Sequence, residues 1–424
     1  MFFVKKYSVF LIFLAGLLIR WSLIFLDYSF DVNNHIVWAY DLWQRGPNDF
    51  FNQPSSNAFG TVFPNYPPLA LLIFYLSYPL QKIFHQLVWW LNITITIFPS
   101  NLIFFVEKKL FLAAMMKLTA IFADLGTAYL IYLFAKKIIP KNKQRWSLMI
   151  AMILFNPAIF YNSAYWGQID MIPVFFVLWA AYLLLFTQYF LTSGLLFVLA
   201  LLVKPTALVY LPTYLVVFIQ KFGWKRLLAT AVAANILFLI SFVPFLKTGE
   251  EFFSGYRLYL NKIMATQSLP YVTNGAFNFW VLITGFEGIK DTTNFILGSS
   301  YRIWGLAISG LLTIVVISGM RKKTDFFYSA FLVAFTAFLF LTKMHERYSM
   351  LQLPFLLLYS LREKKYLKWF VVLSATSFLN LYHSWPVPYN ELLLNILKTA
   401  SVGCLISFVN ILIYAHLLRQ WLKR

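Results

Sequence analysis

The sequence contains little charge and almost no cysteine. Asp, Glu, Lys and Arg account for 12% of the 424 residues, whereas a soluble domain carries roughly 25%. The single cysteine, Cys404, excludes an internal disulfide and any metal site built from several cysteines. Hydrophobic residues make up 61% of the chain and aromatic residues 20%. This composition excludes an ordinary soluble domain and favours a chain that lies largely in lipid.

The apolar residues occur in long blocks, such as 8–26 and 227–246. Each block approaches the roughly 20 residues that a helix needs to cross the hydrocarbon core. The sequence therefore predicts an all-α polytopic membrane protein with about fourteen transmembrane helices, as a single domain over residues 1–424 with no separate soluble domain. The predicted spans are 8–26, 67–84, 86–106, 110–135, 146–164, 171–188, 190–203, 206–220, 227–246, 302–320, 325–342, 348–361, 366–384 and 396–418.

Basic residues outnumber acidic ones, and the formal net charge is +20. A nucleic-acid partner is not expected, because the basic residues form short runs between apolar blocks instead of covering one soluble face. Runs of this kind mark cytoplasmic loops, so we expect a multi-pass protein of the cytoplasmic membrane with both termini in the cytoplasm. The runs are Lys5 and Lys6, 136–145, 220–226, 321–323, 362–365 and 419–424.

This topology places residues 27–66 outside the membrane as an acidic loop, with four aspartates and a single arginine. Aromatic and apolar residues at helical spacing predict a short interfacial helix over residues 33–45. Asp31 comes just before this helix. A carboxylate held at a membrane surface is suited to act as a general base, because partial burial sets its pKa and orientation. The alternative is that Asp31 only caps the helix, a position that Asp favours.

The stretch WGQID, residues 166–170, forms another outer loop and offers an indole, an amide and a carboxylate. A flat ring beside hydrogen-bonding groups is a common arrangement for holding a sugar. Trp166, Gln168 and Asp170 are therefore candidate sugar-binding residues. The alternative is an ordinary turn with an interfacial tryptophan, which is frequent at membrane surfaces.

Two further outer segments carry cations. A proline interrupts a long apolar run and leaves Lys204 near the outer interface, where its ammonium could bind a phosphate or reach lipid head groups. Residues 342–350, TKMHERYSM, include His345, Glu346 and Arg347. A zinc-protease motif would need a second histidine four residues after the first, and that position is a serine. Arg347 suits bidentate phosphate binding, and the alternative is that Glu346 simply neutralises it.

Inside the predicted spans, the costly charged residues are Arg20, Lys117 and Asp124. Intramembrane charges are functional candidates by default. Lys117 and Asp124 are two helical turns apart on one face, so they could share a polar patch or pair with each other. These charges also favour an alternative function, a transporter or flippase for a lipid-linked saccharide. Most polar side chains nevertheless belong to one membrane face, which a transporter or an inactive scaffold leaves unexplained.

At these residues the sequence resembles the GT-C superfamily of membrane glycosyltransferases, which use polyprenyl-phosphate sugars. Within it, the chain is most similar to prokaryotic relatives of the second mannosyltransferase of glycosylphosphatidylinositol synthesis. Single motifs are permissive, whereas the ordered set is fairly specific. The matching stretches are FDVNNHIVWAYDLWQRGPNDFF, NYPPLALL, KLTAIFADL, NPAIFYNSAYWGQIDMI, LLVKPTALVYLP, VTNGAFNFW and TKMHERY, in this order.

The resemblance implies a GT-C-like fold whose active site faces outward. It implies transfer of a sugar, with mannose as the expected sugar, from a polyprenyl-phosphate donor to a lipid or glycan acceptor by inverting displacement. No cofactor and no metal are expected. The superfamily often has a second acidic residue close to the first, whereas valine and asparagine follow here. The implied roles are catalytic base for Asp31, donor-phosphate binding for Lys204, His345 and Arg347, and sugar or acceptor binding for Trp166, Gln168, Asp170 and Tyr66.

Overall fold

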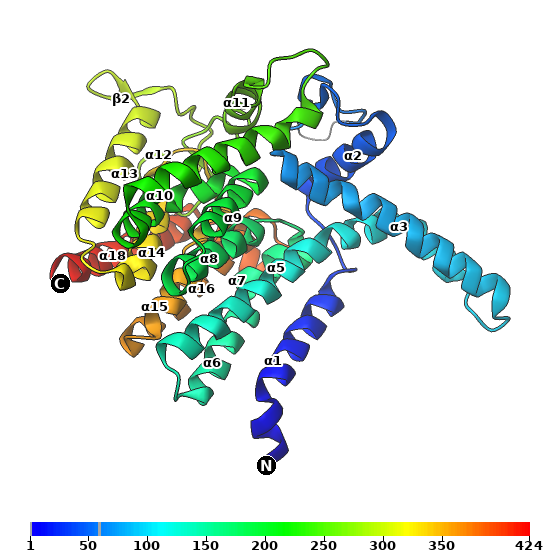
Figure 1. The fold of residues 1–424 in the computed structure, drawn as a ribbon, viewed down its shortest axis with the longest axis horizontal. Coiled ribbons are helices and arrows are strands. Elements are labelled where there is room, and N and C mark those ends of the chain that lie inside the picture. The colour runs from blue at the N-terminus through cyan, green and yellow to red at the C-terminus, as the bar shows by residue number, and fades with distance from the viewer. Residues whose placement is uncertain (1, 58–60) are drawn as a thin grey trace.

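The computed structural model describes residues 2–57 and 61–424, and positions 58–60 of the predicted first outer loop lie outside the described residues. The chain forms a bundle of helices, with the N-terminus at one end of it (Figure 1). The α-helices are α1 (Phe2–Leu23), α2 (Phe30–Arg45), α3 (Pro68–Thr94), α4 (Asn101–Glu107), α5 (Lys109–Ile138), α6 (Lys143–Leu154), α7 (Pro157–Phe160), α8 (Met171–Phe186), α9 (Phe190–Val203), α10 (Leu211–Phe242), α11 (Ser254–Leu258), α12 (Val281–Thr284), α13 (Tyr301–Ser318), α14 (Phe326–Phe340), α15 (Leu353–Ser360), α16 (Leu367–Ser384), α17 (Glu391–Lys398) and α18 (Ala400–Leu422).

Shorter turns of helix and short strands connect these elements. The 3-10 turns are η1 (Phe50–Asn52), η3 (Pro205–Tyr210), η4 (Val243–Phe245), η6 (Lys323–Asp325), η7 (Glu346–Met350) and η8 (Lys364–Tyr366), and the π turns are η2 (Tyr161–Trp166) and η5 (Tyr259–Met264). The strands are β1 (Thr273–Asn274), β2 (Asn294–Ile296), β3 (Ser299–Ser300) and β4 (Met344–His345). Strands β1 and β4 pair in parallel, which places the long segment after α10 beside His345.

Five helical segments among the described residues are long and apolar enough to cross a membrane, and a sixth is counted if one bent pair is taken as a single span. The chain is therefore a helical protein with membrane-spanning segments, as its composition predicts. The five are Lys109–Ile138, Pro205–Phe245, Tyr301–Ser318, Lys323–Phe340 and Ala400–Leu422, the bent pair is Lys143–Leu154 with Pro157–Trp166, and shorter apolar helices are Val9–Leu23, Met171–Phe186 and Phe190–Val203.

Basic runs that are far apart in the sequence lie together at one end of the bundle. Arg145 NH2 donates to the carbonyl oxygen of Ser360 at 2.5 Å. Arg424 NH2 lies 2.6 Å from Glu363 Oε1, and the Arg424 carbonyl accepts a hydrogen bond from Arg321. These contacts join the α5–α6 turn, the turn after α13, the turn after α15 and the C-terminus. We call this end of the molecule the basic end.

The opposite end gathers α2, the break after α9 and the loops after α10. Lys117, near the start of α5, donates to the carbonyl oxygens of Ile24 and Asp27, which follow α1. Asp49 donates through its backbone to Leu246, so the end of α10 also lies here. Lys117 and Lys137 are separated by about 30 Å along α5 at 1.5 Å per residue. This distance is close to the hydrocarbon thickness of a bilayer.

The predicted division into spans 67–84 and 86–106 is wrong. Residues 68–94 form one helix, α3, of 27 residues, followed by a turn and the short helix α4. No glycine or helix-stop signal interrupts residues 80–91, which explains why the helix continues. Gln81 donates to the carbonyl of Val106, so the middle of α3 lies beside the end of α4. The rest of α3 projects away from the bundle (Figure 1).

The two short predicted spans around Lys204 are separated as expected. Helix α9 ends at Val203, and Pro205 opens the 3-10 turn η3, because proline cannot continue the backbone hydrogen bonding. Predicted spans 206–220 and 227–246 belong to one bent element, α10, that changes direction at Gly223 with φ of 79°. The main buried core lies between α5, α8, α14 and α15 and includes Phe134, Leu178, Phe331 and Leu356.

Candidate active site

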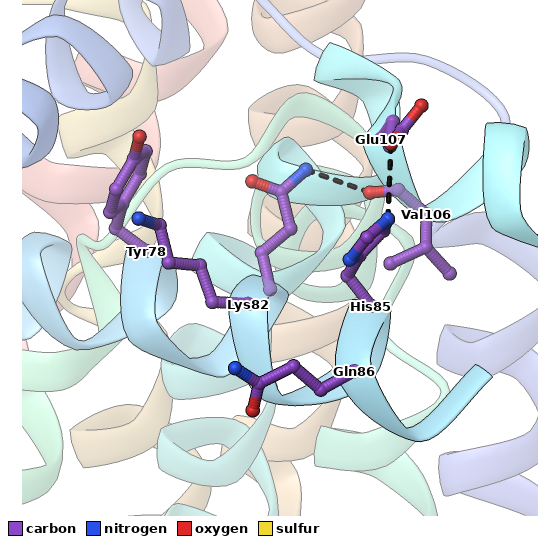
Figure 2. Close-up of a pocket in the computed structure, with 7 residues that line it drawn as sticks. Tyr78, Lys82, His85, Gln86, Val106 and Glu107 are labelled. Carbon is purple, nitrogen blue, oxygen red and sulfur yellow. Dashed lines mark hydrogen bonds and ion pairs between the residues drawn. The ribbon is translucent and has the colours of Figure 1, made fainter. Parts of the chain in front are cut away.

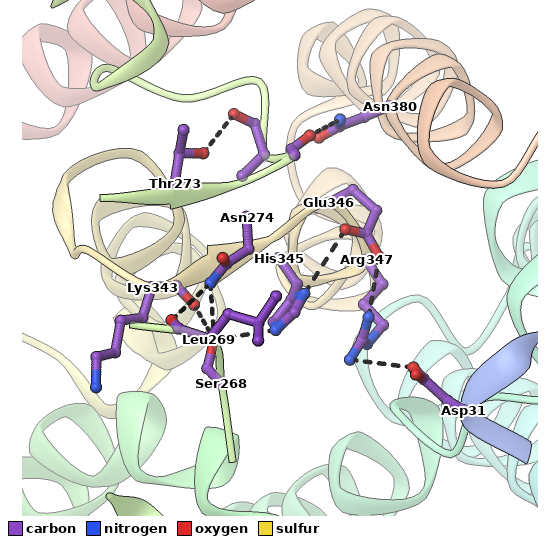
Figure 3. Close-up of polar contacts among 12 residues, drawn as sticks. Asp31, Ser268, Leu269, Thr273, Asn274, Lys343, His345, Glu346, Arg347 and Asn380 are labelled. Carbon is purple, nitrogen blue, oxygen red and sulfur yellow. Dashed lines mark hydrogen bonds and ion pairs between the residues drawn. The ribbon is translucent and has the colours of Figure 1, made fainter. Parts of the chain in front are cut away.

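Asp31 lies in the first turn of α2, and its carboxylate is turned toward other elements. Gln168 Nε2 donates to Asp31 Oδ2 at 2.6 Å. Arg347 NH2 lies 3.6 Å from the same oxygen (Figure 3). The capping interpretation is wrong, because α2 begins at Phe30, two residues earlier than the cap would require, and Ser29 occupies the N-cap position. The Asp31 side chain is 41% exposed. It therefore remains open to a ligand on one side.

The WGQID turn fixes the partner of Asp31. The backbone N–H of Ser29 donates to the Trp166 carbonyl at 2.8 Å, which joins this turn to the start of α2. Gly167 has φ of 89°, in the left-handed region that suits glycine. A Cβ at this position would lie 2.7 Å from Val32 Cγ2. The glycine thus allows α2 to approach closely enough for Gln168 to reach Asp31.

A buried ion pair lies behind this contact. Lys204 Nζ donates to Asp170 Oδ1, and both side chains have 0% exposure. Arg347 Nε lies 3.6 Å from the second oxygen of Asp170. Lys204 therefore does not reach lipid head groups, and the snorkelling alternative is wrong. Its predicted phosphate contact is not open in this structure, because Asp170 neutralises a fully enclosed ammonium.

Arg347 is the centre of the cluster. Its NH1 donates to Glu346 Oε1 at 2.9 Å, while NH2 faces Asp31 and Nε faces Asp170. The predicted pairing with Glu346 is confirmed, but it is one of three carboxylate contacts. Arg347 Nε, Asp170 Oδ2 and Gln168 Oε1 are buried without a hydrogen-bond partner among the described residues. The guanidinium thus keeps donor capacity that the protein does not use.

His345 connects the cluster to the strand pair β1–β4. Its Nε2 lies 2.9 Å from Ser268 Oγ, which also accepts a hydrogen bond from Asn274 Nδ2, and its Nδ1 faces Glu346 (Figure 3). Lys343, at the start of the same turn, extends away from Arg347 in this view. Its φ of 62° is unusual for a residue with a side chain. Such conformations are concentrated at functional sites.

The charges of the cluster act on one another. Burial raises the pKa of the Asp31 carboxyl, but Arg347 and, to a smaller extent, His35, His345 and the hydrogen bond from Gln168 together outweigh burial and hold that pKa below its ordinary value. Burial and the charge of Arg347 lower the pKa of His345, so its imidazole is neutral at pH 7. The cluster contains two cations and three carboxylates. Lys204 contacts Asp170, and Arg347 contacts Asp31, Asp170 and Glu346. The cluster is suited to holding an ionised base.

Aromatic residues enclose the cluster. Tyr66 lies over Lys204, with Nζ 5.7 Å from the ring centroid, and Tyr348 lies on the ammonium as well, at 5.1 Å. His35, one turn after Asp31, stacks on Phe74 at 4.1 Å, and burial lowers its pKa to about 3. His35 is absent from the predicted site, although its i, i+4 spacing from Asp31 was a signal that both share one helix face.

Trp166 and the intramembrane charges have structural partners. The Trp166 indole stacks on Trp385 at 5.6 Å and is 5% exposed, so its face is covered by another ring. Arg20 Nε lies 2.8 Å from Asp124 Oδ2, which also accepts from Ser163. Lys117 binds the carbonyls that follow α1, so it does not pair with Asp124. The predicted Lys117–Asp124 patch is wrong, because the two side chains contact different segments.

Ser268, Asn274 and Tyr348 belong to the site but were not predicted to do so. They come from the segment after η5, which includes β1, and from the turn η7, where no periodic pattern identifies a facing side chain. Among residues 2–57 and 61–424, no three His, Cys, Asp or Glu side chains form a group that could hold a metal ion. A separate cavity at the base of the α3–α4 arm is lined by Gln81, His85 and Glu107, with His85 Nε2 3.0 Å from Glu107 Oε1 (Figure 2).

Comparison of the chain with protein-family models and with curated protein sequences finds no match. The fold and the site indicate a helical membrane protein that carries a cluster of acidic and basic side chains at the end opposite its basic loops. Its function is inferred below from this cluster.

Proposed function

We propose that the protein is a GT-C-like glycosyltransferase of the cytoplasmic membrane. It transfers a sugar, expected to be mannose, from a polyprenyl-phosphate donor to a lipid or glycan acceptor on the outer side. The observation that supports this most is the half-exposed, ionised Asp31, held by Gln168 and Arg347 at the end opposite the basic loops. A transporter receives less support, because Arg20, Lys117 and Asp124 are all engaged in packing contacts.

The proposed topology follows from the positions of the helix ends. If the basic end faces the cytoplasm, as basic loops generally do, the Asp31 cluster faces outward. Helices α3 and α4 begin and end at the outer side, so they do not cross. Removing the two spans predicted for residues 67–106 from the fourteen leaves twelve crossings. This even number keeps both termini in the cytoplasm.

In the proposed reaction, Asp31 accepts the proton of an acceptor hydroxyl while the hydroxyl oxygen attacks the anomeric carbon. The new carbon–oxygen bond forms on the face opposite the leaving group, so the configuration inverts. The bond between the anomeric carbon and the phosphate oxygen breaks, and its electron pair leaves with the polyprenyl phosphate. Gln168 orients the base. A phosphate group needs no added proton to leave near neutral pH.

The cationic side of the site stabilises the leaving phosphate. Arg347 is assigned to this contact, because its NH2 lies 3.6 Å from the half-exposed Asp31 carboxylate. Positioned charges of this type are often the largest catalytic contribution. His345 acts behind this contact, because its ring nitrogens face Ser268 and Glu346 and so position Glu346 beside Arg347. Lys204 and Asp170 act behind these groups by fixing Arg347, and Tyr66 covers the pair on the side of α3.

The test is transfer of radiolabelled mannose from a short-chain polyprenyl-phosphate mannose to a panel of lipid and glycan acceptors in liposomes. Asp31→Asn is expected to lose transfer by roughly 10²–10⁴-fold, the range for a general base. Asp49→Asn is the matched control, since it removes one charge from the same loop outside the cluster, at a left-handed residue that asparagine tolerates.

Three outcomes bear on the proposal. Loss in Asp31→Asn with wild-type transfer in Asp49→Asn supports both the enzyme and its base. Equal transfer in all three proteins refutes Asp31 as the base. Absence of transfer from every donor and acceptor, together with movement of the donor across the bilayer, replaces the transferase by the transporter.

A further inference from the structure

A second charged site lies at the basic end, far from the Asp31 cluster. Lys137 at the end of α5, Arg145 in α6 and Arg362 after α15 line a cavity of about 560 Å³. Its lining includes no Asp or Glu side chain. Three cations that share a cavity repel one another, unless an anion lies between them. The α5–α6 turn and the turn after α15 are held together by the Arg145–Ser360 hydrogen bond.

The nearby carboxylates are engaged elsewhere. Glu363 accepts from Tyr359, Lys365 and Arg424, and Asp325 accepts from two backbone N–H groups at the start of η6. The side chains of Lys137 and Arg362 form no hydrogen bond or ion pair within residues 2–57 and 61–424. Arg145 uses one N–H on Ser360 and keeps the rest of a five-donor guanidinium. Asp325 acts on Arg362 only through its charge, without an ion-pair contact, so the cationic cavity keeps most of its donor groups unused.

Apolar side chains form the remaining wall of the cavity. Ile139, Phe186 and Leu361 line it beside the cations, and Phe186 is 38% exposed at the end of α8. An anion with an apolar continuation matches this surface better than a small inorganic ion, because an ion alone would leave the apolar wall in water. Anionic phospholipids combine a phosphate with glycerol and acyl chains at the depth where a membrane helix ends.

We infer that this cavity, formed by Lys137, Arg145 and Arg362, binds the phosphate head group of an anionic phospholipid. Guanidinium groups bind phosphate oxygens in a bidentate manner, and lysine adds a point charge. The proposed glycosyltransferase topology determines only the leaflet, which would be the cytoplasmic one. The site itself does not depend on that function, since it shares no residue with the Asp31 cluster.

The test measures lipid binding to the full chain in phosphatidylcholine nanodiscs that contain increasing phosphatidylglycerol, by native mass spectrometry. Lys137→Gln/Arg362→Gln is expected to bind phosphatidylglycerol roughly twenty-five-fold more weakly than wild type, about fivefold for each basic residue removed near anionic lipid. The matched control is Lys141→Gln/Lys364→Gln, which removes the same charge from exposed positions of the same two turns outside the cavity.

A selective loss in the cavity variant supports the site. Equal phosphatidylglycerol binding in wild type and both variants refutes it, and so does an equal loss in the two variants, which would indicate a diffuse charge effect. A separate arm adds pyrophosphate in pure phosphatidylcholine. If pyrophosphate stabilises the protein against heat and phosphatidylglycerol does not, the lipid assignment is overturned in favour of a soluble phosphate. Single Arg362→Gln, at an exposed side chain without bonds, repeats the test if the double variant misfolds.

Discussion

The buried pair between Lys204 and Asp170 gives the sharpest test of how the site is held. We expect Asp170→Asn to destabilise the protein more than Lys204→Met. Breaking a buried ion pair by removing one partner costs about 3–5 kcal/mol, because the remaining charge is enclosed without compensation. The two variants differ in what the remaining charge still contacts.

After Lys204→Met, Asp170 keeps Arg347 Nε at 3.6 Å, so its charge stays partly compensated. The expected loss is at the low end of the range, about 3 kcal/mol. After Asp170→Asn, Lys204 keeps a neutral amide oxygen, the faces of Tyr66 and Tyr348 and the charge of Asp31, while it still lies in the field of Arg347. A ring face contributes about 2 kcal/mol at most when it is desolvated. The expected loss is therefore near 5 kcal/mol.

The measurement is equilibrium unfolding in mixed detergent micelles, with wild type, the two single variants and Lys204→Met/Asp170→Leu. The double variant is expected to recover part of the loss, because it leaves neither buried charge unpaired. Losses below about 1 kcal/mol in both single variants would mean that the pair is solvated. A larger loss in Lys204→Met than in Asp170→Asn would refute the assigned role of Arg347 as a shared partner.

Two further predictions concern Asp31 and the glycine beside it. The pKa of Asp31 lies below its ordinary value, so the carboxylate stays ionised as the pH falls. We therefore expect transfer activity to persist through pH 5, together with the stabilisation that the ion pair contributes. Both are expected to be lost only at pH values below the ordinary carboxyl range. A pH–rate profile with an acid limb near pH 6 would contradict this. Gly167→Ala is expected to cost roughly 3 kcal/mol in the same unfolding assay, from left-handed strain and the contact with Val32.

Local sequence information was sufficient for the class of the protein. Apolar blocks of helical length can be satisfied only by internally hydrogen-bonded helices in lipid, so the membrane-spanning segments follow from composition. The proline after Lys204 and the glycine of WGQID also have local consequences, because each restricts or permits a particular backbone conformation. The basic runs could also be identified from local sequence, because charged loops are distinct from the apolar blocks between them. They lie at one end of the bundle, as their spacing predicts.

Only the tertiary structure decided which charges meet. Asp31, Gln168 and Arg347 are up to 316 residues apart in the sequence, and nothing local states that one guanidinium faces three carboxylates. Lys204 was read as accessible because its break lies near an interface, whereas packing encloses it against Asp170. Sequence patterns specify which backbone groups a segment can satisfy, while side-chain partners depend on how the helices pack.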